Sequence, residues 1–145
     1  MGILNKSFFK GIDIFLREKQ FFIGFLKDKN LVYLESKGFI FEERLRNACL
    51  VILEVLQKTG ARSIIINLSL LSVIGEQDRL WMKEVFYPQM KKLLLANIYI
   101  ISPDSYFGKL SIKDLNIKEI YKPREGCTLL EFDSLDKLLL SDPKF

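Results

Sequence analysis

Residues 61–81 read ARSIIINLSLLSVIGEQDRLW, and this stretch decides the fold. Its first part, residues 63–68, is almost continuously apolar and rich in isoleucine, with no alternation of polar and apolar positions. Such a run predicts a strand that is covered on both faces, as in the centre of a sheet between helices. We expect the strand to end at about Leu68, to turn through residues 69–75, and to continue as a helix from about Glu76.

The corner between this strand and the helix is the first candidate site. In open α/β sheets, ligand or partner groups usually lie at the carboxyl ends of the strands. Two acidic residues of the corner could be a catalytic pair, but acids in a first helical turn more often complement the helix dipole. No residue of the corner specifies a chemistry, so we predict a partner-binding surface made of Ser69, Ser72, Gly75, Glu76, Gln77 and Asp78.

The N-terminal part of the chain predicts antiparallel strands. Residues 12–17 are a candidate edge strand, and Phe21–Leu26 and residues 31–36 are two further apolar runs. Residues 27–30, KDKN, separate these two runs, and their Asp and Asn tolerate turn geometry. We therefore expect an antiparallel hairpin, which Gly38 ends.

The next segment, residues 41–56, predicts a helix that packs on the sheet. Gly60 follows it and is suited to a helix C-terminus, because glycine readily adopts a left-handed conformation. Apolar side chains recur there every three or four residues, at Phe41, Leu45, Ala48, Cys49, Ile52 and Leu56.

A second helix is expected over residues 76–95. Pro88 lies within it and disfavours helical geometry at the preceding residue, so we predict a kink or break at Phe86 and Tyr87. Asn97–Ile101 follows as a second buried strand, parallel to the first if the connection is a right-handed crossover.

The last third of the sequence predicts two more helices and one strand. Ser102 and Pro103 have the composition of a helix start, Gly108 weakens that helix, and residues 111–114 can restart it. Residues 129–132 predict a strand, after which Asp133 or Ser134 caps a closing helix through Leu140. The expected central core, packed on the helix at 41–56, is Ile64, Ile65, Ile66, Leu68, Ile98, Ile100 and Leu130.

Composition favours one globular domain over residues 1–145. The chain is 49% hydrophobic and 28% charged, and its net charge of +4 comes from lysines interspersed with acids, which does not favour nucleic-acid binding. Two cysteines, Cys49 and Cys127, suit a reducing cytosol. The N-terminal residues do not resemble an export signal, no apolar run is long enough to span a membrane, and we expect a cytoplasmic protein.

Catalytic chemistry is poorly represented in the sequence. The chain has no histidine, which excludes Ser-His and Cys-His catalysis, and it has no zinc spacing, phosphate loop or nucleophile elbow. We expect no metal, no cofactor and no enzymatic activity, and Cys49 fits a core residue. Five apolar residues could either pack a closed core or line an apolar ligand pocket, namely Trp81, Phe86, Tyr87, Phe107 and Leu110.

The order of the expected elements resembles the STAS fold of bacterial anti-sigma-factor antagonists, the SpoIIAA-like proteins. The likeness covers about residues 20–140 and extends to a STAS-like branch found in Bacteroidetes and related bacteria. It is carried by residues 32–39 (VYLESKGF), 73–78 (VIGEQD) with Trp81, 86–88 (FYP), 107–111 (FGKLS) and 132–135 (FDSL).

This resemblance implies an α/β fold with an N-terminal antiparallel hairpin, parallel central strands and about four flanking helices. In the antagonists a kinase phosphorylates a serine at the helix start after the central strand, where this chain has residues 75–78, GEQD. The phosphoswitch therefore does not carry over. The resemblance implies a non-enzymatic regulatory module that binds an unidentified protein partner and could form a homodimer. The alternative is a carrier of a small nonpolar ligand, because CRAL-TRIO carriers resemble this fold.

Overall fold

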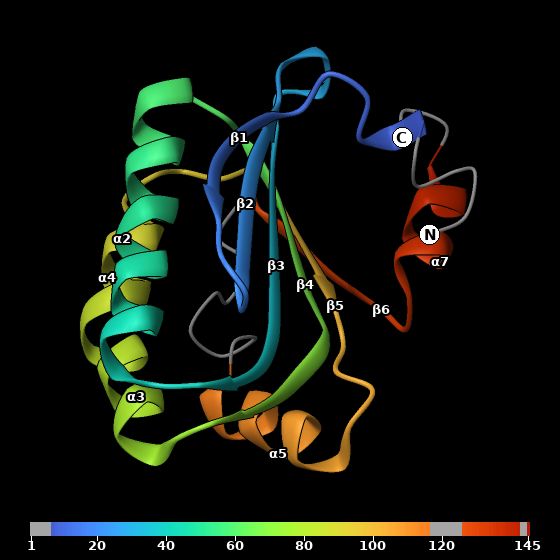
Figure 1. Ribbon diagram of the computed structural model, residues 1–145. Helices are drawn as coiled ribbons and strands as arrows, with labels where there is room; N and C mark the ends of the chain where they lie inside the picture. The colour runs from blue at the N-terminus through green and yellow to red at the C-terminus, as the bar shows by residue number, and fades with distance from the viewer. Residues whose placement is uncertain (1–6, 117–125, 143–144) are drawn as a thin grey trace.

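The computed structural model describes residues 7–116, 126–142 and 145, and within them the chain forms one mixed six-stranded sheet (Figure 1). The strands lie side by side in the order in which they occur in the sequence. They are β1 (Asp13–Arg17), β2 (Phe21–Leu26), β3 (Leu31–Ile40), β4 (Ser63–Ile74), β5 (Asn97–Ile101) and β6 (Thr128–Phe132).

Pairing is antiparallel from β1 to β3 and parallel from β3 to β6. Figure 1 shows α2, α3 and α4 on one face of the sheet, α7 on the other, and α5 beneath the lower end of β4. The predicted hairpin, parallel strands and flanking helices are confirmed. The helical segments are α2 (Glu42–Thr59), α3 (Glu76–Trp81), the π-helical turn η2 (Met82–Phe86), α4 (Tyr87–Lys91), α5 (Tyr106–Leu115) and α7 (Leu135–Ser141), and the 3-10 turn η1 (Lys27–Lys29) joins β2 to β3.

Strands β3 and β4 are both longer than predicted. Gly38 does not end β3, because it adopts a left-handed conformation (φ 70°) at an irregularity in the pairing, and the strand continues to Ile40. The expected turn over residues 69–75 is wrong, since β4 runs on to Ile74 beside β3. The helix start at Glu76 and the end of α2 at Gly60 (φ 67°) are confirmed.

The helix after β4 is irregular where proline predicts it to be. A π-helical turn, η2, occupies the five residues before Tyr87, and Pro88 lies in the first turn of α4. Proline has no N–H to donate to the carbonyl four residues earlier, and a wider turn accommodates the lost bond. The helix ends at Lys91 rather than at residue 95.

Helix α5 starts later than predicted and is continuous. Its N-cap is Ser105, whose Oγ accepts the N–H of Gly108 at 3.0 Å, and not Ser102. Gly108 does not interrupt the helix, and residues 111–114 need not restart it. The strand at Thr128–Phe132 and the Ser134 cap of α7 are confirmed, the cap by a 3.1 Å bond from the N–H of Lys137.

Two apolar cores lie on the two faces of the sheet. The larger lies between the sheet and α2 to α4 and includes four of the seven predicted core residues, with a fifth, Ile66, partly buried against it. Ile65 instead belongs to the second core, beneath α7 and Phe8. The placement of Leu130 in the core is wrong, because it lies on the edge strand β6 and is 45% exposed.

Candidate functional site

The predicted corner lies at the carboxyl end of β4, and α5 closes its free edge. Pairing with β5 ends at Asn67, so the later residues of β4 need other partners on that side. The N–H of Asp104 donates to the Ser69 carbonyl at 3.0 Å, and the Ser105 hydroxyl donates to the Leu71 carbonyl at 3.0 Å. Ser111 Oγ accepts the N–H of Ile74 at 3.1 Å. Side-chain hydroxyls and one loop amide therefore replace a neighbouring strand.

Asp78 is the buried polar group of the corner. It is 5% exposed, and its Oδ2 accepts the N–H of Glu42 at 3.0 Å. Because Glu42 begins α2, the Asp78 carboxylate serves the N-terminus of α2 as well as lying in the first turn of its own helix. Its Oδ1 has no hydrogen-bond partner within the described part of the chain. Asp78 therefore faces inward and joins two helices.

The remaining predicted partner-binding residues differ in exposure. Glu76 and Gln77 are exposed, whereas Ser69, Ser72 and Gly75 are half-buried. Beside them Arg79 donates to the Ile74 carbonyl and pairs with Asp114 of α5 at 3.4 Å. Of the six predicted partner-binding residues, only Glu76 and Gln77 are thus fully presented to solvent.

The five candidate pocket residues are not brought together. Phe86 and Tyr87 line a small apolar cavity of about 60 Å³ between the sheet, α2 and α4. Trp81 is half-buried at the flank, with the Arg46 guanidinium 5.4 Å from its ring centroid. Phe107 is 66% exposed and Leu110 is 40% exposed on α5.

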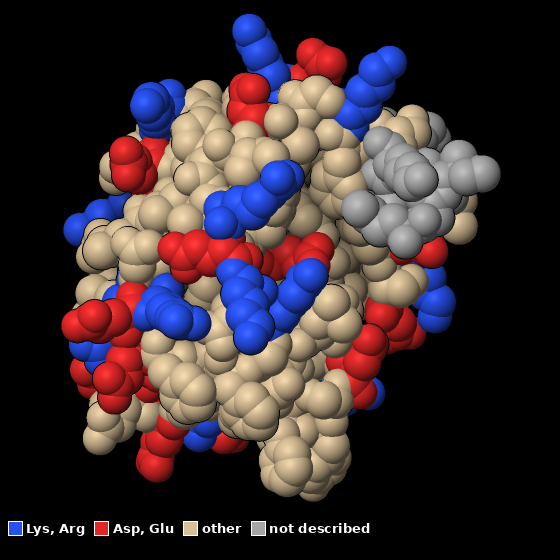
Figure 2. All heavy atoms as spheres, in the orientation of Figure 1, with Lys and Arg blue, Asp and Glu red and all other residues tan. Residues whose placement is uncertain are grey.

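Exposed apolar side chains gather instead at the carboxyl end of β3 and β4. Phe39 and Phe41 stack with ring centroids 6.3 Å apart, and Tyr106 and Phe107 meet edge to face at 5.5 Å. Figure 2 shows the lower end of the molecule, over the β3–α2 connection and α5, as largely free of charged residues. We call this set the aromatic end, and its members are Phe39, Phe41, Leu80, Tyr106, Phe107 and Leu110, each at least 40% exposed.

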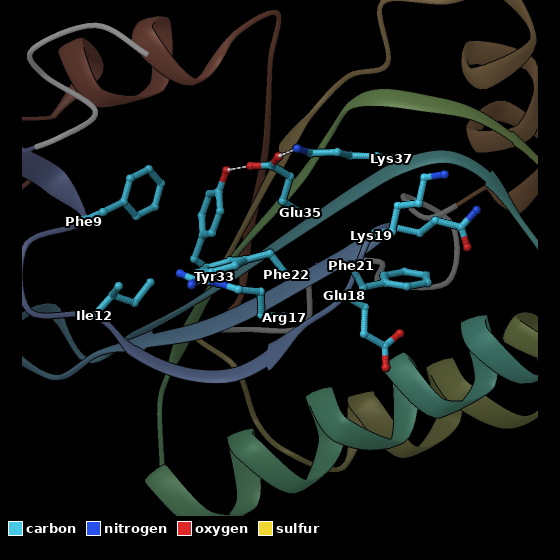
Figure 3. A pocket seen from close by; sticks show the side chains of 11 residues that line it. Phe9, Ile12, Arg17, Glu18, Lys19, Phe21, Phe22, Tyr33, Glu35 and Lys37 are labelled. Carbon is cyan, nitrogen blue, oxygen red and sulfur yellow. Dashed lines mark hydrogen bonds and ion pairs between the residues drawn. The ribbon is translucent and has the colours of Figure 1, made fainter.

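A second hollow, which the sequence did not predict, lies across β1 to β3 on the α7 side of the sheet (Figure 3). Its volume is about 410 Å³. Phe9 and Ile12 lie at one end, and Lys19 and Lys37 lie at the other. We call it the β1–β3 groove.

Tyr33 and Glu35 form a fixed polar pair at the border of this groove. The Tyr33 hydroxyl donates to Glu35 Oε2 at 2.8 Å and accepts from Asn67 Nδ2 at 2.8 Å. The other carboxylate oxygen, Oε1, pairs with Lys37 Nζ at 3.5 Å. Burial raises the pKa of Tyr33 far above its ordinary value, and the carboxylate of Glu35 adds to this, so the phenol stays neutral.

A weak sequence signal for the groove does exist. Tyr33, Glu35 and Lys37 alternate along β3, which places them on one face of the strand. The groove itself could not be predicted, because Arg17 and Phe22 come from other strands. Only the pairing of β1 and β2 with β3 places them beside this row.

The cysteines show no sign of reactivity or metal binding. Cys49 is buried, and burial together with the negative charge of Asp78 raises the pKa of its thiol. Cys127 is partly buried and also free. Among residues 7–116, 126–142 and 145, no three His, Cys, Asp or Glu side chains are placed to hold a metal ion, and no helix is long and apolar enough to cross a bilayer.

No protein-family model matches the chain, and no curated protein matches it.

Comparison by structure does find a known fold. The structure of the anti-sigma factor antagonist SpoIIAA in its unphosphorylated form matches 90% of this chain and 94% of its own, with a TM-score of 0.53 and 8% identity. A second structure, described as the crystal structure analysis of Mglu, matches 52% of this chain and 18% of its own at 20% identity, and its TM-score of 0.36 is too low to indicate a shared fold. The chain therefore has the SpoIIAA-like fold of STAS domains.

Proposed function

We propose that this protein is a non-enzymatic regulatory module of the cytoplasm that binds a protein partner through the aromatic end and the neighbouring Glu76 and Gln77. The observation that carries the proposal is the exposure of Phe39, Phe41 and Phe107, at 56%, 59% and 66%. Large aromatic side chains contribute much of the energy of protein interfaces, and a contiguous exposed apolar patch commonly marks one.

The geometry around the patch favours a rigid binding surface. Asp78 ties the start of α3 to the start of α2, next to Phe41. Ser105 and Ser111 bind α5, with Phe107, to the main chain of β4. The aromatic side chains therefore project from elements that are bonded to one another. Binding a partner would cost little conformational entropy, because these elements are already ordered in the free protein.

The carrier alternative has less support. Ligand pockets usually have volumes of about 300 to 1,000 Å³, whereas the interior cavity measures about 60 Å³. Phe86, Tyr87 and Met90 are buried around it, so the apolar interior is closed by its own side chains. A fatty acid or isoprenoid would require α2 or α4 to move off the sheet.

The test is affinity capture from the source organism with quantitative mass spectrometry. The test variant is Phe39→Ser with Phe41→Ser, which removes the stacked pair without touching the buried core. Its matched control is Leu50→Ser with Leu140→Ser, two exposed leucines of α2 and α7, at 57% and 72%.

We expect the wild type and the leucine control to capture one specific partner in similar amounts. The phenylalanine variant should capture at least tenfold less of it. The captured partner must then bind the purified wild type directly, as measured by calorimetry. If all three proteins retain the same partners to the same extent, the aromatic end is not the interface and the proposal fails. Sedimentation of the purified proteins separates a second copy of this chain from a different partner.

A further inference from the structure

We propose that the β1–β3 groove is a binding site for a small ligand with a planar aromatic body and an anionic group, either a carboxylate or a phosphate. The groove measures about 410 Å³, within the usual range for small-molecule sites. It lies on the face of the sheet opposite α2, and the inference does not depend on the proposed partner surface.

The aromatic body is expected on the rings that line the groove. Phe22 and Tyr33 meet edge to face with centroids 6.2 Å apart, and Phe9 and Tyr33 do so at 4.6 Å. Tyr33 is 2% exposed and bonded at its hydroxyl, so it holds the two outer rings in place from beneath. A flat ligand can stack on Phe22 once the exposed Arg17 side chain, which lies over that ring, turns aside.

The charges of the groove favour an anion. Arg17, Lys19 and Lys37 line it together with two carboxylates. Glu35 is already neutralised, because its oxygens are bonded to the Tyr33 hydroxyl and to Lys37. Figure 3 shows Glu18 pointing toward α2 and away from Glu35.

Two cations are therefore left for a ligand. Arg17 and Lys19 are exposed and form no salt bridge with any residue in the described part of the chain. The Arg17 guanidinium lies over the Phe22 ring, 5.9 Å from its centroid. A ligand ring that displaces it from Phe22 leaves the guanidinium next to the ligand, where it can bind the anionic group.

The test uses three probes that share one ring system, namely 2-naphthyl phosphate, 2-naphthoate and 2-naphthol, which is uncharged at pH 7. Binding to the full chain is measured by calorimetry and by NMR shifts of residues 17–22 and 33–37. The test variant is Arg17→Gln with Lys19→Gln. Lys83→Gln with Lys91→Gln is the control, because it removes the same charge from exposed lysines of η2 and α4.

We expect at least one of the two anions to bind saturably and the neutral naphthol to bind at least fivefold more weakly. The Arg17 and Lys19 variant should weaken the anion about five- to tenfold, and the control should not. Whichever of the two anions binds more tightly shows whether the anionic group of the ligand is a carboxylate or a phosphate. Absence of binding, equal binding of naphthol, or equal weakening by both variants would overturn the assignment.

Discussion

Asp78 shows how one residue at the corner can connect two helices. Its carboxylate comes from α3 but accepts the first N–H of α2, a helix whose own N-cap residue, Phe41, provides no side-chain acceptor. The 18 residues of α2 give its N-terminus a partial positive charge, which stabilises a buried carboxylate. Against this, Oδ1 is buried without a hydrogen-bond partner in the described residues, which is unfavourable.

Replacing Asp78 should reveal which effect is larger. We expect Asp78→Ala to lower the free energy of unfolding by about 1 to 2 kcal/mol, because the Glu42 N–H loses its acceptor. Asp78→Asn retains an acceptor oxygen and should lose less, and urea denaturation of both variants measures the difference. An alanine variant as stable as the wild type would show that burying the charge costs as much as the cap contributes.

At the scale of elements, the packing of α5 on β4 depends on a glycine. A Cβ built on Gly108 would lie 2.5 Å from the Leu71 carbonyl oxygen and 2.8 Å from Pro103 Cβ. This close approach lets the Ser105 and Ser111 hydroxyls reach the β4 main chain. Gly108, which the sequence suggested as a weak point of the helix, is required for its docking.

Gly108→Ala should therefore destabilise the protein, although alanine is the better helix former by about 1 kcal/mol. We expect a loss of about 2 to 3 kcal/mol, because α5 must move away from β4 and leave buried main-chain groups without partners. Gly75→Ala is the matched control. Among the described residues its Cβ would lie within 4 Å of Asp78 Oδ2 alone, at 3.7 Å, and the substitution should cost less than about 1 kcal/mol in the same urea titration. Equal losses would contradict the close-packing explanation.

For the whole molecule, the sequence predicted the layers better than it predicted the site. A nearly continuous apolar run such as Ile64 to Leu68 reveals a central strand, because burial on both faces leaves few positions for polar residues. Its one polar residue, Asn67, is buried and donates to the Tyr33 hydroxyl. The extension of β4 to Ile74 could not be predicted, since Ser69 and Ser72 are typical turn residues until Asp104 and Ser105, just before α5, bind their carbonyl groups. The exposure of the Phe107 side chain could not be predicted either, because it depends on which face of α5 packs against the sheet.

Two buried phenols and one buried thiol should make the stability of the protein depend on pH in the alkaline range. Burial raises the pKa values of Tyr33, Tyr87 and Cys49, and the two tyrosines lie on opposite faces of the sheet. The charge of Glu35 adds to the effect at Tyr33, and Cys49 adds to the effect at Tyr87. All three groups therefore stay protonated in the folded protein at pH values where the unfolded chain releases their protons.

The free energy of unfolding should fall as pH rises above these groups' ordinary pKa values, 9.0 for the thiol and 10.0 for each phenol. A raised folded-state pKa stabilises the fold fully below the unfolded pKa, and each group then loses about 1.4 kcal/mol of that contribution per pH unit. Urea denaturation from pH 8 to pH 11 measures the slope. Tyr87→Phe should make the slope above pH 10 shallower by about 1.4 kcal/mol per pH unit, and so should Tyr33→Phe, despite a lower starting stability from its lost hydrogen bonds. A wild-type slope in both variants would show that neither buried phenol titrates as described.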